Sequence, residues 1–497
     1  MRLNYKTIGH FFGLLLLCNG VFILTAGLVG FGFGDATTPM LLSSASIVLG
    51  LGIIAMLVTK NHSREMGRRD GYIVVALGWI VMAISGALPY VMTGVIPEFT
   101  NAFFETVSGY TTTGATILTD IESVPKGVLF WRSLTHWIGG MGIIVLAIAI
   151  LPLLGIGGMQ LFTAEAPGLS SDKLHPRITD TAKRLWFIYV GLTLAETLLL
   201  NWAGMSFFDA INHAMATVST GGFSTKNSSL MFYNHLPMVQ YIVMFFMLVA
   251  GSNFVLTYFA IKGKWKKIWG DEEFMLYIKF IAIFTLVTAS IIYLKSDFLV
   301  PNDAFPMVYG IYEADFRHSM FQVLSVITTT GFVTADFTSW TPFLTVLFFG
   351  LMFLGGSSGS TSGGIKVVRH LVTIRNGFLE FKRALHPNAL LPVRFNKKII
   401  SETIVFNVLA FFILYMLSFI IGALVLSAIG LDFVSALGVS ASSLGNIGPA
   451  LGNFSPVDTF ESMPALGKWW CSFLMLIGRL ELFTVLILFT PFFWRNR

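Results

Sequence analysis

Long runs of apolar residues, separated by short polar segments, recur along the whole chain. Each run is about 20 residues or longer, enough for a helix to cross the roughly 30 Å hydrocarbon core of a bilayer. The pattern predicts ten spanning helices, at residues 8–33, 40–59, 71–93, 127–153, 185–204, 236–261, 273–295, 341–365, 401–428 and 464–493. No stretch between them resembles a soluble domain, so we expect an all-α polytopic membrane protein embedded in a lipid bilayer.

After the first two predicted spans, one pattern occurs four times. An apolar helix is followed by an outer stretch, about ten apolar or small residues, a turn rich in Ser, Thr and Gly, and a second apolar helix. The turns end at Gly114, Gly222, Gly331 and Gly448, which follow one another at intervals of about 110 residues. Each short segment cannot span a membrane and is too apolar for an exposed loop, so it predicts a re-entrant helix that returns to the outer face.

The repeats divide the chain into five units. Residues 1–70 hold two extra N-terminal helices, and residues 71–184, 185–272, 273–400 and 401–497 hold one repeat each. The predicted fold is therefore two N-terminal spans plus four helix–re-entrant loop–helix repeats, in a pseudo-fourfold arrangement around one pore.

The four turns carry the chemistry expected of a cation filter. A dehydrated cation needs several oxygen atoms in place of its hydration shell, and the backbone carbonyls of converging loops can supply them. Aiming successive carbonyls at one axis requires angles that glycine adopts most cheaply, while threonine hydroxyls can brace the turn or add ligands. Each short helix also directs its partially negative C-terminal end towards the cation. The predicted ion-binding residues are Thr112, Thr113, Gly114, Thr220, Gly221, Gly222, Thr329, Thr330, Gly331, Asn446, Ile447 and Gly448, with Gly221 as an alternative to Gly222 for the filter glycine of the second turn.

The eighth predicted span contains a glycine-rich tract at residues 355–364. Each glycine costs a helix interior about 1 kcal/mol relative to alanine, so the helix should break there, below the filter. A cytoplasmic linker is the simpler explanation of such a tract, but the apolar run before it, residues 343–354, is too short to span alone. No Gly-Lys-Ser/Thr follows, which excludes a phosphate-binding loop. We predict a flexible intramembrane loop under the pore, with Gly355, Gly356, Gly359, Gly363 and Gly364 as gate residues.

Arg479 lies midway along the last apolar run. A central intramembrane arginine costs about 2.5–3.5 kcal/mol on insertion scales and faces the protein interior or a cavity. It is either one half of a structural ion pair or a positive charge that limits cation leak at the pore. We favour the second role because the same span follows the fourth turn. Four other polar residues near the predicted outer mouth are explained as interfacial: Glu105, His213, Arg317 and His318.

Composition and charge placement add an orientation. Only 12% of the residues are charged and mean hydropathy is +0.76, whereas a soluble chain carries about 25% charged residues. Most of the 32 Lys and Arg residues fall in six clusters, at 2–6, 60–69, 173–184, 262–267, 366–398 and 495–497. Placing all six in the cytoplasm satisfies the positive-inside rule, puts both termini inside and explains the net charge without a nucleic-acid partner. The two cysteines lie in apolar runs and offer no Cys-based metal site.

The turn motifs resemble those of the Trk/Ktr/HKT superfamily of potassium transporters, and within it the TrkH-type membrane subunits. The resemblance rests on Thr-Thr-Thr-Gly-Ala-Thr at 111–116, Ser-Thr-Gly-Gly-Phe-Ser-Thr at 219–225, Thr-Thr-Thr-Gly-Phe at 328–332 and Gly-Asn-Ile-Gly-Pro at 445–449, and it extends over nearly the whole chain. In that family, glycine at all four aligned positions accompanies a preference for K⁺ over Na⁺, and the glycine-rich loop acts as a constriction. The resemblance implies a homodimer in a bacterial-type inner membrane and a TrkA-type cytoplasmic nucleotide-binding regulatory ring as partner. It implies no covalent cofactor, and a nucleotide (ATP/ADP or NAD) only through that ring.

The sequence thus predicts K⁺ uptake through a four-loop filter that is gated by the glycine-rich loop and Arg479. An ion-coupled secondary transporter, moving K⁺ with H⁺ or Na⁺, is the alternative, because such proteins also break helices at the midplane in paired repeats. An intramembrane enzyme is disfavoured, since the spans contain no His-Glu-x-x-His and no paired Asp. The basic segment 366–398 is either a positive-inside anchor or a docking surface for a cytoplasmic subunit.

Overall fold

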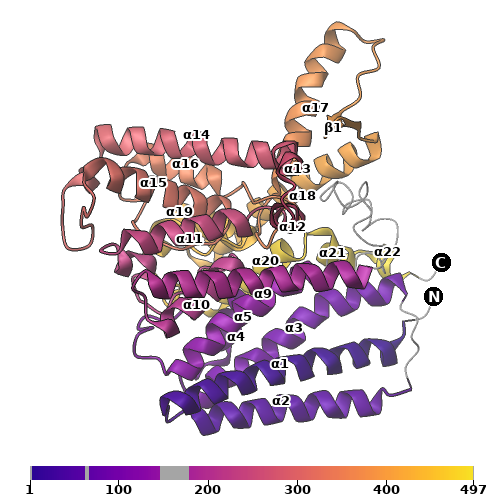
Figure 1. Cartoon of the computed structure of the whole chain (residues 1–497). Coiled ribbons are helices and arrows are strands. Elements are labelled where there is room, and N and C mark those ends of the chain that lie inside the picture. Colours follow the sequence, from indigo (N-terminus) through magenta and orange to yellow (C-terminus); the bar gives the residue numbers. More distant parts are fainter. Residues whose placement is uncertain (1–2, 62–66, 146–177, 496–497) are drawn as a thin grey trace.

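The computed structural model describes residues 3–61, 67–145 and 178–495, and these residues are mostly helical. Long helices lie side by side along roughly the same direction, and one helix, α17, extends beyond the body of the molecule (Figure 1). The long helices are α1 (Tyr5–Phe33), α2 (Thr38–Val58), α3 (Arg68–Thr93), α5 (Lys126–Val145), α9 (Ile178–Trp202), α14 (Glu272–Lys295) and α18 (Glu402–Ile429). Six of the described helices are long and apolar enough to cross a membrane, and two bent helix pairs raise the number of candidate spans to eight.

Three of the predicted spans are not continuous helices. The sixth consists of α11 (Pro237–Ala250) and α12 (Phe254–Ile261), which meet at 109°. The tenth consists of α20 (Ala465–Arg479) followed, at 112°, by α21 (Phe483–Leu486) and the 3-10 helix η5 (Ile487–Phe489). The eighth contains only the ten-residue α16 (Pro342–Leu351) before a non-helical segment. Predicting unbroken helices at 236–261 and 464–493 was wrong, because hydropathy does not register a change of chain direction within an apolar run. In the eighth span, the helix ends before the glycine-rich tract, in agreement with the break predicted there.

Two of the predicted features lie partly outside the described residues. The fourth span, predicted at 127–153, is seen as α5 up to Val145. The basic cluster at 173–184 is described only from Ile178 onwards.

Four short helices occur where the sequence predicts re-entrant segments. They are α4 (Phe99–Tyr110), α10 (Phe207–Val218), α15 (Ile311–Ile327) and α19 (Phe433–Gly445). The side chains of Ser206 and Asp432 begin α10 and α19, since each accepts a backbone N–H from the first turn of its helix. The C-terminal half of each short helix is buried. The turns that follow these helices therefore lie inside the protein.

The two chain ends meet at one end of the molecule. Ile8 of α1, Ile73 of α3 and Phe493 of α22 (Pro491–Trp494) form one apolar cluster there. An even number of membrane crossings would produce this arrangement. Large apolar side chains along the outer helices are exposed, for example Phe406, Ile413 and Leu424 on α18. Such faces suit contact with lipid.

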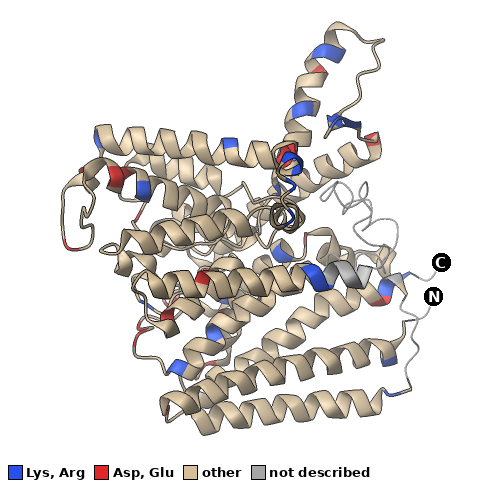
Figure 2. Cartoon of the chain, viewed as in Figure 1, with Lys and Arg blue, Asp and Glu red and all other residues tan. Residues whose placement is uncertain are grey.

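The segment after α16 leads into an extension that we call the arm. The arm comprises α17 (Val367–Leu385) and residues 386–400, with the antiparallel strands β1 (Arg394–Phe395) and β2 (Lys398–Ile399). The turn residues Asn396 and Lys397 both have positive φ, as a two-residue type I′ hairpin requires. Figure 2 shows Lys and Arg residues along α17 and the hairpin. At its base the arm contacts α14, where Glu272 accepts hydrogen bonds from Arg375 (2.6 Å) and the Asn396 amide (2.8 Å).

The shorter elements connect these helices. They are η2 (Ser229–Tyr233), α13 (Trp265–Trp269), η3 (Asp297–Leu299) and η4 (Gly452–Phe454).

Candidate ion-conduction site

The four turns that follow the short helices share one backbone conformation. Gly114, Gly222, Gly331 and Gly448 all have positive φ, between 78° and 98°. The residue two positions earlier also has positive φ in every turn: Thr112, Thr220, Thr329 and Asn446, between 50° and 55°. The amide between these two positions donates to the carbonyl five residues earlier, at 2.8–3.0 Å, in all four turns. This shared geometry aligns Gly222, and not Gly221, with the other three glycines.

The four turns also close into a ring. A Cβ atom added to Gly114 would collide with the carbonyl oxygen of Gly221 in the second turn. In the same way, an added Cβ would collide with a carbonyl oxygen of the next turn at each of the other glycines: Gly222 with Thr330, Gly331 with Ile447, and Gly448 with Thr113. Each glycine therefore lies against the carbonyl that precedes the glycine of the next turn, and the fourth turn returns to the first. Four backbone carbonyls from distant parts of the chain thus belong to one closed ring of contacts, and backbone carbonyl oxygens are the donors that a dehydrated cation requires.

The sequence did not predict that the residues two positions before the glycines have a left-handed backbone conformation, with positive φ. A β-branched residue rarely adopts positive φ, and a strained backbone of this kind costs on the order of 1–3 kcal/mol. Asparagine tolerates this region better than threonine, which accounts for Asn446 in the one turn that departs from Thr-Thr-Gly. Strain that recurs at four equivalent positions indicates that the surrounding packing holds the turns in place.

The threonine hydroxyls mainly brace the turns. Thr113 and Thr330 each form a hydroxyl–hydroxyl hydrogen bond within their own turn, at 2.8 and 2.7 Å. Thr220 donates to a backbone carbonyl at 2.7 Å, and Thr329 accepts a backbone N–H at 2.6 Å. Among the described residues, the buried hydroxyl of Thr112 has no hydrogen-bond partner. It is the hydroxyl in this set that is free to bind another ligand.

Glu105, His213, Arg317 and His318 are buried, so the prediction that they are interfacial was wrong. Glu105 of α4 accepts hydrogen bonds from Arg132 Nε (2.7 Å), the Thr116 hydroxyl (2.9 Å) and the Ile117 amide (2.9 Å). His213 occupies the equivalent place in α10, and its Nε2 lies 2.8 Å from the Ser224 hydroxyl. In both repeats, a polar side chain nine residues before the glycine holds the residue two positions after it.

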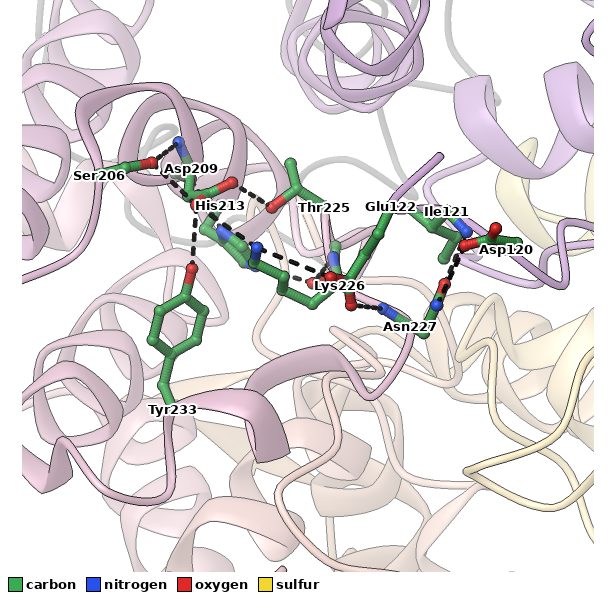
Figure 3. Close-up of polar contacts among 11 residues, drawn as sticks. Asp120, Ile121, Glu122, Ser206, Asp209, His213, Thr225, Lys226, Asn227 and Tyr233 are labelled. Carbon is green, nitrogen blue, oxygen red and sulfur yellow. Dashed lines mark hydrogen bonds and ion pairs between the residues drawn. The ribbon is translucent and has the colours of Figure 1, made fainter. Parts of the chain in front are cut away.

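A second polar network joins the segments that leave the first and second turns (Figure 3). Lys226 Nζ lies 4.0 Å from the carboxylates of both Glu122 and Asp209. Asp209 also accepts the Thr225 hydroxyl at 2.6 Å. The Asn227 side chain accepts the Ile121 amide at 2.6 Å. These contacts fix the two segments relative to each other where they leave the ring.

Residues 352–366, which we call the glycine-rich segment, pack directly against the ring. The Gly363 amide donates to the Thr329 hydroxyl, and the Thr361 hydroxyl donates to the Val218 carbonyl at 3.0 Å. A Cβ added to Gly363 would meet the Gly445 carbonyl. The segment thus touches the ends of α10, α15 and α19. Its hydroxyl residues are buried: Ser357, Ser358, Ser360, Thr361 and Ser362. This burial rules out the cytoplasmic-linker interpretation.

Glu273, at the start of α14, tethers the glycine-rich segment. Its carboxylate accepts the Ser358 amide (2.6 Å), the Ser358 hydroxyl (2.7 Å) and the Val368 amide (3.3 Å). The same carboxylate therefore holds both the segment and the first residues of the arm. Nothing in the sequence singled out Glu273, because an acid at a helix N-terminus is commonplace.

The other predicted gate glycines lie along this segment. Gly355 donates to Ile365 at 2.9 Å, and Gly356 accepts the Val367 amide at 3.1 Å. Gly359 and Gly364 have positive φ, and Gly359 accepts the Phe254 amide at 3.2 Å. The segment is therefore a folded loop held by hydrogen bonds to its neighbours.

Residues 355–359 also match the Gly-x-Ser-x-Gly spacing of hydrolase nucleophiles. The buried Ser357 hydroxyl has no hydrogen-bond partner among the described residues. No described base is therefore placed to activate it, and the spacing alone does not indicate a nucleophile.

Arg479 joins the glycine-rich segment to α5. Its guanidinium donates to the Thr361 carbonyl at 2.7 Å and to the Gly139 carbonyl at 3.2 Å. No carboxylate in the described part of the chain lies within ion-pair distance of it, and Glu481 pairs with Arg369 instead, at 2.6 Å. A structural ion pair for Arg479 therefore finds no support. A buried positive charge with no carboxylate partner among the described residues therefore lies beside the glycine-rich segment.

Comparison with known protein families assigns this chain to one of them. The profile of the TrkH family, described as a cation transport protein, matches residues 43–496. The chain belongs to the TrkH family. Its resemblance to TrkH-type subunits is thereby confirmed.

Relatives in the TrkH family match over nearly their full length. The Trk system potassium uptake protein TrkH of Escherichia coli (strain K12) is 40% identical over 498 residues, covering 99% of this chain and 100% of the relative. The Trk system potassium uptake protein TrkG of the same organism is 35% identical, covering 99% of each chain. The crystal structure of the potassium transporter TrkH from Vibrio parahaemolyticus superimposes with a TM-score of 0.88 at 36% identity, covering 100% of both chains. The helical membrane-protein fold class predicted from the sequence is therefore confirmed.

Proposed function

We propose that this TrkH-family protein takes up K⁺ across the bacterial inner membrane through the ring of four turns. One observation carries the proposal: each of the four aligned glycines lies against a carbonyl of the next turn, in a closed cycle. The relatives named as Trk potassium uptake proteins support K⁺ as the ion. The four repeats then surround one pore in a pseudo-fourfold arrangement.

The ring acts as the selectivity filter. A K⁺ ion that enters it exchanges water for backbone oxygens, including those of Thr113, Gly221, Thr330 and Ile447. The four short helices direct their C-terminal ends towards the ring, and their partial negative charges stabilise the cation. Bracing of the turns keeps the oxygens at one spacing, so the smaller Na⁺ is bound less well.

The glycine-rich segment and Arg479 form the gate on the inner side of the ring. The segment lies against three of the short helices, and Arg479 holds it to α5. Its loop conformation can rearrange without unwinding a helix. Opening therefore requires breaking the hydrogen bonds to Thr361 and Ser358 and displacing the guanidinium from the cation path.

The arm is the docking surface for a cytoplasmic partner. Three observations support this role: the arm is basic, it extends beyond the helical body, and it lies at the start of α14, close to Glu273, which holds the gate (Figures 1 and 2). Both termini face the cytoplasm as well. The partner implied by the family resemblance is a TrkA-type nucleotide-binding ring, and the membrane subunit works as a homodimer.

Growth of a bacterium that lacks its own K⁺ uptake systems tests the proposed function. Expression of this chain with its matching regulatory subunit should restore growth on low K⁺. The Gly331→Ser variant, expressed to the same level, should restore it poorly. Full membrane expression without rescue would contradict the proposal. Rescue that disappears when the H⁺ or Na⁺ gradient is collapsed at constant K⁺ gradient would favour ion-coupled transport.

A further inference from the structure

Two side chains of α5 enclose the second turn of the ring. Arg132 and His136 are one helical turn apart and lie on the same face of α5. The centre of the Phe223 ring lies 3.5 Å from the Arg132 guanidinium carbon and 3.9 Å from the centre of the His136 ring. Phe223 directly follows Gly222. Arg132 also donates to the Ser224 carbonyl at 2.8 Å, so a helix of the first repeat holds the turn of the second.

The His136 ring occupies the place of a side chain that the second turn lacks. The residue before the filter glycine is Thr113, Thr330 or Ile447 in the other turns, and all three side chains are buried. In the second turn this residue is Gly221. A Cβ added to Gly221 would coincide with Nδ1 of His136. Gly221 does not have positive φ, so its backbone conformation does not require glycine. The imidazole is what excludes a side chain there.

Ordinary core packing does not explain His136. The side chain is fully buried, and neither ring nitrogen has a hydrogen-bond partner among the described residues. An apolar side chain of similar size would fill the same space without burying two unpaired polar atoms. The ring also touches the residue whose carbonyl lies against Gly114 in the neighbouring turn.

We infer that His136 is a positioning residue of the selectivity filter, which replaces the missing side chain at position 221 and fixes the Gly221 carbonyl within the ring. The inference rests on the proposed function. It accounts for the Gly-Gly sequence of the second turn, where the first and third have Thr-Gly. It also makes the selectivity of the second turn depend on α5, which belongs to the preceding repeat.

Exchanging the two positions tests this role. In liposomes with purified protein, His136→Ala should lower the K⁺/Na⁺ flux ratio by about tenfold, because the Gly221 carbonyl loses its support. Gly221→Thr alone should give little folded protein, because the new side chain meets the imidazole. The double variant His136→Ala/Gly221→Thr should recover folding and a flux ratio within about twofold of the wild type, since its second turn reads Thr-Thr-Gly like the first and third.

The double variant keeps the test decisive if His136→Ala alone does not fold. A folded His136→Ala protein with the wild-type flux ratio would overturn the inference. So would a double variant that folds but stays unselective. A lower melting temperature at an unchanged ratio would assign His136 to packing alone. The wild-type protein separates the two claims. If it carries no K⁺ flux, the proposed function fails. If it carries K⁺ flux, the variants test only the role of His136.

Discussion

Gly114 and Gly94 both have positive φ, but their surroundings differ. Gly114 lies against the Gly221 carbonyl, whereas a Cβ added to Gly94, at the end of α3, would meet nothing within 4 Å. Backbone conformation alone therefore does not distinguish the filter glycines from other glycines with positive φ. The distinguishing feature is their close approach to a carbonyl of the next turn.

This contrast predicts the effect of serine at the filter glycines. Gly114→Ser and Gly331→Ser each add a Cβ at positive φ, which costs roughly 1–2 kcal/mol, and each displaces a neighbouring carbonyl. We expect the K⁺/Na⁺ flux ratio to fall by about tenfold or more in liposomes. Gly94→Ser carries the same backbone strain and should leave the ratio unchanged. An unaltered ratio in both filter variants would mean that these turns do not select the ion.

Arg479 should act on conduction and not on selectivity. Two like charges 4 Å apart repel by about 4 kcal/mol at an effective dielectric constant of about 20. Arg479→Gln should therefore raise the basal K⁺ flux, per folded molecule, by about tenfold or more at an unchanged K⁺/Na⁺ ratio. Arg479→Lys keeps the charge and should remain much less leaky. A folded Arg479→Gln protein with no added leak would end the assignment of Arg479 to the gate.

At the scale of elements, the glycine-rich segment is held from two sides. Arg479 binds it from α20, and Glu273 binds it from α14. Because Glu273 also accepts the Val368 amide, a movement of the arm relative to α14 would strain the Ser358 contacts. Glu273 thus links α14 to both the glycine-rich segment and the start of the arm.

Removing the tether should favour opening. Glu273→Ala leaves the three donors on Ser358 and Val368 without their acceptor, and a buried donor that loses its partner costs about 1–3 kcal/mol. We expect a basal K⁺ flux about three- to tenfold above wild type and the same K⁺/Na⁺ ratio. Glu272→Ala is the matched control, since Glu272 binds the arm but makes no described contact with the segment. Wild-type basal flux in folded Glu273→Ala would show that the tether does not restrain the gate.

Sequence periodicity predicted the long helices, the four short helices and the glycine-rich break, because each follows from local hydropathy and glycine content. It missed the breaks at residues 251–253 and 480–482, where the chain turns within apolar runs. It also missed His136, Arg132 and Glu273. Their roles depend on contacts between residues 85 to 92 positions apart, which no local pattern encodes. The sequence signal for His136 was Gly221 itself, since the other three turns carry Thr113, Thr330 or Ile447 at the aligned position.

At the scale of the whole molecule, the arm is the feature that extends beyond the helical body (Figure 1). Arg394, on its hairpin, has an exposed side chain, whereas the Arg383 guanidinium is bonded within the arm to Glu380 and the Leu391 carbonyl. Charge reversal at Arg383 would therefore disturb the arm itself. Arg394 is the cleaner probe of partner binding.

Binding of the regulatory partner should depend on this surface. Arg394→Glu should weaken its pull-down by about tenfold, because an attractive contact becomes a repulsive one. Arg383→Glu should weaken it as well. Lys295→Glu, at the opposite end of α14, changes the charge equally and should have no effect. Unaltered binding by Arg394→Glu would place the interface elsewhere.

The central claim is that the four-turn ring conducts K⁺ selectively, and ⁸⁶Rb⁺ uptake into liposomes of purified protein tests it most directly. Uptake should be driven by a K⁺ gradient alone, should be blocked by external K⁺ and should be little affected by the same concentration of Na⁺. Gly331→Ser should abolish this difference between the two ions. Equal competition by Na⁺ and K⁺ in the wild-type protein, or no ⁸⁶Rb⁺ uptake even with the regulatory partner present, would contradict the account.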